Sequence, residues 1–145
     1  SSVLITTAAS PVGTSFRENI CSGYLTELHT FEPELSSECP ALSDALPMNA
    51  DNLRIYGSSC FDYLGTLSQC HFPTTIPSEL SAACRSFVSN TASYNGCINT
   101  HRNRVPFMLP VFHAYLAFRS ELWANSHDVI RLLDERGQTV DVLTY

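Results

Sequence analysis

The chain has 145 residues, of which 44% are hydrophobic and 15% charged, and its net charge is −6, with arginine as the only basic residue apart from histidine. This length and composition indicate one globular domain and exclude an intrinsically disordered chain. The negative charge disfavours nucleic acid as a partner, and no apolar run reaches the about 20 residues that a membrane-spanning helix needs.

The first half of the chain predicts one strand, two helices and a loop. The segment Val3–Thr7 is apolar and β-branched, which is typical of a strand. In the segment 16–31, apolar residues recur at spacings of three and four, which predicts a helix. Three prolines and many small polar residues indicate a loop over 32–52, before the short apolar stretch 53–56. The sequence Gly57-Ser58-Ser59 then indicates a turn and the N-cap of a second helix.

The second half predicts an extended connector and three further helices. After them, the spacing of the apolar residues changes from helical to alternating. The connector is the proline-containing segment 72–77. Ser78 is expected to cap a helix that runs over 78–90, and a shorter helix follows over 92–100. After two prolines, the apolar positions of 111–124 predict another helix.

The C-terminal residues predict a β-hairpin. The segments 129–133 and 139–145 are rich in valine and leucine, and they flank Asp134-Glu135-Arg136-Gly137. Gly137 supplies the positive φ that a type I turn followed by a bulge requires. We expect the hairpin to join the N-terminal strand in one small sheet, because a lone hairpin is marginal in water.

Six cysteines form the strongest signal in the composition. An even number in a short chain indicates a disulfide framework and an oxidising compartment, so we expect a secreted or cell-surface protein. The unit Cys-x-x-aromatic-aliphatic occurs three times, and on a helix its cysteine, aromatic and aliphatic residues share one face. A second cysteine follows each unit. Among the 15 connectivities that six cysteines allow, we therefore predict the nearest-neighbour pairs Cys21–Cys39, Cys60–Cys70 and Cys84–Cys97.

The alternative to disulfides is thiol chemistry or a zinc site. Cys97 and His101 are four residues apart, Cys70 precedes His71, and Cys60 is expected near a helix N-terminus, where a thiolate is stabilised. Structural zinc usually takes four ligands, often from paired C-x₂₋₄-C units, and no C-x-x-C is present. A cysteine nucleophile would also need a histidine held beside it. We therefore predict no catalytic residue, no metal and no cofactor, with a thiol-dependent enzyme or a zinc-binding protein as the alternative.

Two further groups of side chains have an ordinary structural interpretation. The basic run His101-Arg102-Asn103-Arg104 is expected to be a solvated loop. The aromatic residues Tyr115, Phe118 and Trp123 recur at helical spacing, and such a stripe is more often core than binding site.

Several stretches of the sequence resemble a known family. The close, SHDVIRLLDERGQTVDVLTY, resembles the final hairpin of lamin-tail domains, which are immunoglobulin-like β-sandwiches. The N-terminal stretch, ITTAASPVGTSFRENICSGYL, is similar to a strand and the segment that leaves it in a bacterial subgroup of this family, where they precede a cysteine-rich insertion. The motifs YGSSCFDYL, QCHFP, IPSELSAACRSF, SYNGC and SELW resemble that insertion. The resemblance implies a non-catalytic structural or binding module of exported, surface-attached bacterial proteins.

The sequence therefore predicts an α+β fold. One domain, 1–145, would consist of a strand in 1–10, a disulfide-stapled, cysteine-rich helical insertion over 14–127 and a hairpin over 128–145. The sandwich strands that precede a segment like VLITT in the family are absent, which leaves open that the chain is the late part of a larger domain. As function we predict a binding or structural module that takes a protein partner or self-associates through strand edges.

Overall fold

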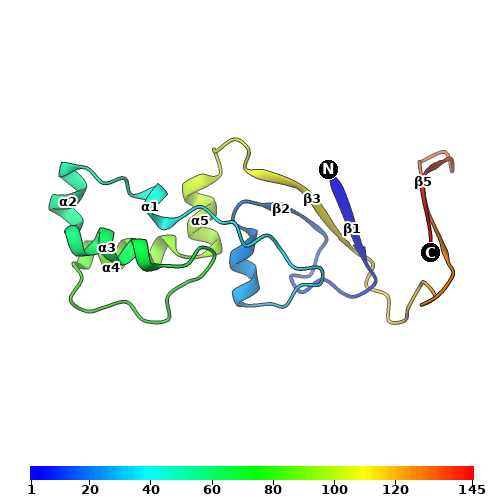
Figure 1. Ribbon diagram of the computed structural model, residues 1–145, viewed down its shortest axis with the longest axis horizontal. Coiled ribbons are helices and arrows are strands. Elements are labelled where there is room, and N and C mark those ends of the chain that lie inside the picture. Colours follow the sequence, from blue (N-terminus) through cyan, green and yellow to red (C-terminus); the bar gives the residue numbers. More distant parts are fainter.

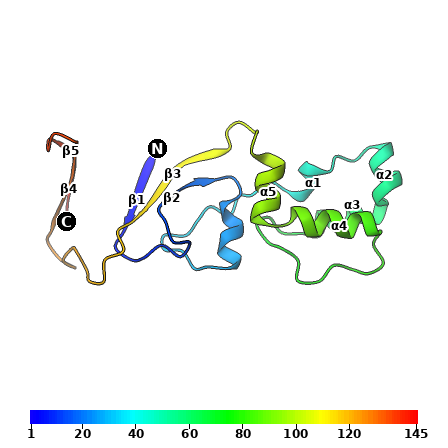
Figure 2. The same cartoon turned by 180° about the vertical axis from the view of Figure 1, so that it is seen from behind.

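The computed structural model describes all 145 residues, and it has three parts arranged along one long axis (Figure 1). The helices lie at one end, a three-stranded sheet lies in the middle, and a two-stranded hairpin lies at the other end, as the view from behind also shows (Figure 2). The N-terminus belongs to the sheet and the C-terminus to the hairpin. The α+β class is confirmed.

The sheet joins segments that are far apart in the sequence. It contains β1 (Ser2–Thr6), β2 (Phe16–Asn19) and β3 (Met108–Tyr115) in the order β1-β3-β2. The central strand β3 pairs in parallel with β1 and antiparallel with β2. The predicted N-terminal strand is confirmed, and its partner is β3.

The C-terminal hairpin is confirmed, but its expected place in the sheet is wrong. Strands β4 (Val129–Leu133) and β5 (Thr139–Thr144) form a separate two-stranded sheet. Gly137 has a φ of +77°, and the Asp134 carboxylate accepts hydrogen bonds from the backbone N–H groups of Arg136 and Gln138. The β1 strand has taken β3 as its partner instead of the hairpin.

Six short helices complete the regular structure, five of them at the end away from the hairpin and one beside the sheet (Figure 1). Their bounds are η1, a 3-10 helix (Ser22–Glu27), α1 (Leu42–Ala45), α2 (Ala50–Tyr56), α3 (Ser58–Thr66), α4 (Ala82–Thr91) and α5 (Tyr94–His101). The helix after Gly57 is thus confirmed as α3, and the one over 92–100 as α5. The predicted loop over 32–52 contains α1 and the start of α2. The helix over 78–90 begins later, because Ser81 rather than Ser78 accepts a hydrogen bond from the N–H of Cys84.

The helix expected over 16–31 is wrong, because the chain turns at Asn19. Its side-chain oxygen accepts a hydrogen bond from the N–H of Cys21, while its own N–H donates to the hydroxyl of Ser22. Such side-chain to backbone hydrogen bonds compete with helix formation. The result is β2, then a turn, then the 3-10 helix η1.

The helix expected over 111–124 is also wrong, because most of its first half belongs to the central strand β3. Phe112 and His113 point to opposite faces, which is the period of a strand. Pro110 lacks an N–H and is tolerated because the ladder with β2 is interrupted there by a register shift. The Arg17 side chain instead donates to the carbonyl of Leu109 at 2.7 Å. The range 14–127 therefore contains two strands as well as the helices.

The predicted cysteine pairing is wrong. Instead of Cys21–Cys39, Cys60–Cys70 and Cys84–Cys97, the bonds are Cys21–Cys97, Cys39–Cys70 and Cys60–Cys84. The helix-borne cysteines do point inward, as the spacing predicted. They meet each other across the helix interface, with 5.8 Å between the Cα atoms of Cys60 and Cys84, so neither bonds to the turn that follows its own helix.

The core lies almost entirely in the helical half, in two clusters. The larger one gathers aliphatic side chains from α1, α3 and α4 around the Cys60–Cys84 disulfide. The smaller one packs Tyr24 against the other two disulfides. Burial in this second cluster raises the pKa of Tyr24. The disulfides are therefore parts of the core and not surface links.

Candidate functional site

The arrangement of the sulfur atoms gives little support to a thiol-dependent enzyme or to a zinc site built on cysteine. All six cysteines are in disulfides, so neither Cys70 nor Cys97 has a thiolate for a metal, and Cys60 has none for a nucleophile. His71 contacts the carboxylate of Glu27. No group of three or more His, Cys, Asp or Glu side chains is placed to hold a metal ion.

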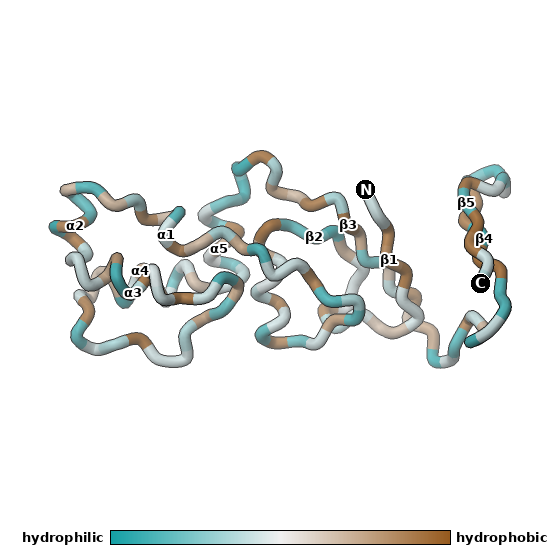
Figure 3. Tube along the Cα trace, in the orientation of Figure 1, coloured by the Kyte–Doolittle hydropathy of each residue, from teal (hydrophilic) through white to brown (hydrophobic).

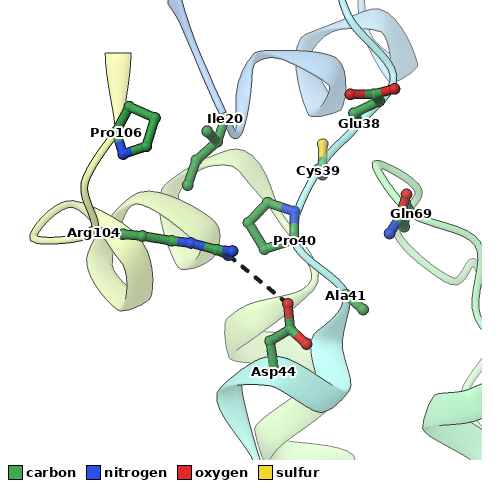
Figure 4. A pocket seen from close by; sticks show the side chains of 9 residues that line it. All are labelled: Ile20, Glu38, Cys39, Pro40, Ala41, Asp44, Gln69, Arg104 and Pro106. Atoms are coloured by element: carbon green, nitrogen blue, oxygen red, sulfur yellow. Dashed lines mark ion pairs between the residues drawn. The ribbon is translucent and has the colours of Figure 1, made fainter. Parts of the chain in front are cut away.

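The basic run 101–104 borders a shallow pocket of about 470 Å³ (Figure 4). Arg104 is the one cationic side chain of its lining and extends toward Asp44, with 3.9 Å between Nη1 and Oδ2. The pKa of His101 is lowered by partial burial and by Arg104, against the opposing effect of Asp44. Because the guanidinium already has a carboxylate partner, this pocket does not concentrate positive charge for an anion.

A buried acid–histidine pair, which sequence reasoning did not single out, lies under the sheet. Nε2 of His113 on β3 is 2.6 Å from Oε1 of Glu18 on β2, and the two side chains are 1% and 4% exposed. The other carboxylate oxygen of Glu18 accepts a hydrogen bond from the N–H of Ser36 at 3.2 Å. The pair thus ties both strands to the loop that leads to Cys39.

Aromatic rings enclose this pair on the inner face of the sheet. Phe16, His113 and Tyr115 are stacked, with 5.2 Å between the ring centroids of Phe16 and His113. Burial and the negative charge of Glu18 raise the pKa of Tyr115. Neither Glu18 nor His113 lines a surface pocket. The pair resembles an acid–base dyad in its chemistry, but it is buried and lies outside the surface pockets, which favours a structural role.

The outer face of the sheet is apolar and open. Val3 and Ile5 on β1 pair with Phe112 and Ala114 on β3, and residues paired in this way point to the same side. Val3 is 59% exposed, Ile5 45% and Phe112 38%. We call this side of the sheet the outer face.

The hairpin stands opposite the outer face, and an open cleft separates them. The cleft has a volume of about 490 Å³. Its apolar lining comes from Val3 and Ile5 on one side and from both strands of the hairpin on the other. The hairpin residues are Ile130, Leu132, Asp141, Val142 and Leu143. Two apolar sheet surfaces therefore face each other without closing into a packed core.

The hairpin exposes aliphatic side chains on both of its sides. Figure 3 shows hydrophobic residues along both of its strands, and also along β1 and β3. Large aliphatic side chains on β4 and β5 are about half exposed, namely Val129, Leu132, Leu133, Val140, Val142 and Leu143. His113 is the last buried residue of the chain. We call the outer face, the cleft and the hairpin together the apolar surface.

The aromatic stripe predicted over 111–124 does not form one face. Tyr115 is on the inner face of the sheet, Phe118 is 55% exposed, and Trp123 lines a second pocket beside Tyr145. The strand edges that the sequence pointed to are present. The hairpin's separation from the sheet is what creates the apolar surface, and no local pattern could have indicated it.

Comparisons with known proteins found no match to this chain among protein-family models, curated proteins or solved structures. None of the helices combines the length and the hydropathy that a transmembrane segment requires.

Proposed function

We propose that this protein is a non-catalytic binding module of the extracellular space or the cell surface, and that it engages a protein partner with the apolar surface. The observation that carries the proposal is the clustering of half-exposed aliphatic side chains on the outer face and the hairpin. Contiguous exposed apolar patches of this kind mark interaction sites in folded proteins.

The marginal stability of a lone hairpin supports the same proposal. Two strands without a covering layer are barely stable in water, and no residue of β4 or β5 is buried. A partner that covers the hairpin would supply the missing apolar contacts. Binding and ordering of the hairpin would then be one event.

The disulfides support the proposed location. Three disulfides and no free thiol are typical of proteins that fold in an oxidising compartment. The same observation counts against a thiol-dependent enzyme and against a zinc site built on Cys70 or Cys97, because both need free cysteine side chains.

The resemblance to lamin-tail domains enters the proposal as an interpretation of the two sheets. A three-stranded sheet that faces a hairpin across an apolar cleft is the arrangement expected of part of a β-sandwich. In a complete sandwich the inner faces pack about 10 Å apart and exclude water. We propose that the partner completes the apolar packing that this chain leaves open.

Site-specific photo-crosslinking in the producing cells tests the proposed function. A benzophenone amino acid replaces Val142 on the hairpin in one variant and Arg54 on α2 in the control, and both native side chains are exposed. We expect ultraviolet light to give a protein–protein adduct at position 142 and none at position 54. No adduct at 142, or equal adducts at both positions, would overturn the proposal.

A further inference from the structure

We infer that the partner is a second copy of this chain and that the two copies join edge to edge through β1, antiparallel, about a two-fold axis at Leu4. This inference rests on the proposed function and names the occupant of one part of the apolar surface. It depends on three observations, which concern the free edge of β1, the symmetry of its sequence and the amount of exposed apolar area.

The first observation is the free edge. In the order β1-β3-β2, strand β1 pairs with β3 on one side and has no strand partner on the other. An edge strand presents unpaired N–H and C=O groups, which can pair with another chain. Natural edges are often protected by a lysine, a proline or a bulge, and the sequence Ser-Val-Leu-Ile-Thr of β1 has no charged residue and no proline.

The second observation is the symmetry of that sequence. A two-fold axis through Leu4 places Ser2 opposite Thr6 of the other copy, Val3 opposite Ile5, and Leu4 opposite Leu4. Every pair thus joins side chains of the same kind. A two-fold interface uses the same patch on both subunits, so it requires this self-complementarity.

The register also keeps the faces of the sheet together. Residues opposite each other in an antiparallel pair point to the same side, so Val3 and Ile5 of both copies meet on the outer face. The result is a continuous six-stranded sheet with one apolar side. Because the axis is perpendicular to the sheet, both hairpins lie on that side.

The third observation is the area. About nine large side chains of the outer face and hairpin are roughly half exposed, and burying one completely removes about 60–120 Å² of apolar surface from water. Together they offer on the order of 400 Å² for burial. A stable interface of about 800 Å² per partner contains roughly 450 Å² of non-polar surface. This area is large enough for a dimer in which the two hairpins, gathered on one side of the joined sheet, pack against each other and against the outer faces.

Charge exchange across the proposed pairs tests the inference. In the variant Val3→Lys/Ile5→Lys, each lysine faces a lysine of the other copy. In the matched variant Val3→Lys/Ile5→Glu, each lysine faces a glutamate. Both variants lose the same two apolar side chains, so their comparison isolates the charge that position 5 presents to position 3 of the other copy. Sedimentation velocity at concentrations up to about 100 µM gives the mass of each disulfide-intact chain.

We expect the natural chain to sediment at twice its 16.0 kDa. The Lys/Lys variant should weaken the dimer about 100-fold, since two cross-strand pairs change from apolar contact to repulsion. The Lys/Glu variant should remain a dimer, and added salt should weaken it. Circular dichroism and thermal melting of the natural chain and both variants verify that the fold is unchanged.

Three results would overturn the inference: a natural chain that stays monomeric, a Lys/Lys variant that still dimerises, or a Lys/Glu variant as monomeric as Lys/Lys. The crosslinking experiment separates this failure from that of the proposed function. If the chain is monomeric and its adduct at position 142 contains a different protein, the proposed function stands and the inference of a second copy is wrong. If the chain is monomeric and gives no adduct, both the proposed function and the inference are wrong.

Discussion

Glu18 and His113 are 95 residues apart in the sequence and 2.6 Å apart in the fold, where both side chains are almost completely buried. The pair connects β2 to β3 and, through Ser36, to the loop before Cys39. It lies beneath a sheet whose opposite face is open to solvent.

Removing one member of this pair is expected to destabilise the protein strongly. Glu18→Ala leaves the buried His113 ring and the partly buried Ser36 N–H without their acceptor, at a cost of about 1–3 kcal/mol. Glu18→Gln keeps an acceptor of the same shape and should cost clearly less. Urea denaturation without reductant measures both. Equal losses for the two variants would show that packing volume, and not the hydrogen bonds, sets the effect.

The disulfide connectivity has a direct test by tryptic digestion. The chain is cut after each of its arginines, and Cys21 and Cys39 lie together in the fragment 18–54, while 55–85 and 86–102 hold the other four cysteines. The bonds of this fold join all three fragments into one species before reduction. Nearest-neighbour bonds would instead release 18–54 as a single fragment with an internal disulfide.

Two glycine substitutions should change stability in opposite directions. A Cβ at Gly23 would lie 2.7 Å from the Ser36 carbonyl oxygen and 3.0 Å from the Cys39 sulfur, so Gly23→Ala should cost about 1–3 kcal/mol. A Cβ at Gly65, in α3, meets nothing within 4 Å. Gly65→Ala should therefore stabilise the protein by about 0.5–1 kcal/mol, as an alanine does within a helix. Thermal unfolding compares them, and a stabilising Gly23→Ala would contradict the tight packing.

The base of the hairpin should open at low pH. The Asp128 carboxylate accepts hydrogen bonds from the N–H groups of Ala124 and Val129, which lower its pKa below the usual 3.8. A pKa that is lower in the folded state stabilises the fold above the unfolded value, and that contribution is lost as pH falls through the folded pKa. The amide resonances of Ala124 and Val129 should therefore shift together below about pH 4.

The variant Asp128→Ala is the control for this titration. Its two amide resonances should lie near the low-pH positions at every pH, because no carboxylate accepts from them. Movement of the same resonances with pH in the variant would assign the titration to another group.

The elements that sequence reasoning located correctly are those specified by neighbouring residues. The hairpin depends on Gly137 and on alternation within two adjacent segments, and α5 depends on a cap at Ser93. The strand β1 is a run of apolar and β-branched residues. In each case the signal and the structure occupy the same few residues.

The elements that were missed depend on distant partners. Strands β2 and β3 pair across about 90 residues, and the apolar spacing of 16–31 fits a helix as well as a strand followed by a turn. The repeated cysteine unit showed which side of each helix faces the core. It could not show which two helices pack against each other. The contact between α3 and α4 is what brings Cys60 to Cys84.

The candidate site was predictable only in outline. The edges of β1 and of the hairpin follow from the strand predictions, and they indicated association with another chain. The cleft between the outer face and the hairpin follows from the choice of β3 as the partner of β1. That choice is a matter of tertiary packing, which overrides local propensity.

The bond between Cys21 and Cys97 has a mechanical consequence. It closes a loop with a sequence separation of 76 in a chain of 145 residues, so a pulling force applied on either side passes through the sulfur atoms and bypasses about half of the chain. The chain between the two cysteines, which contains η1 and α1 to α4, stays unloaded, while β1, β2, the end of α5, β3 and the hairpin carry the tension. A surface module built in this way would yield first where it holds its partner and would keep its helical half folded under load.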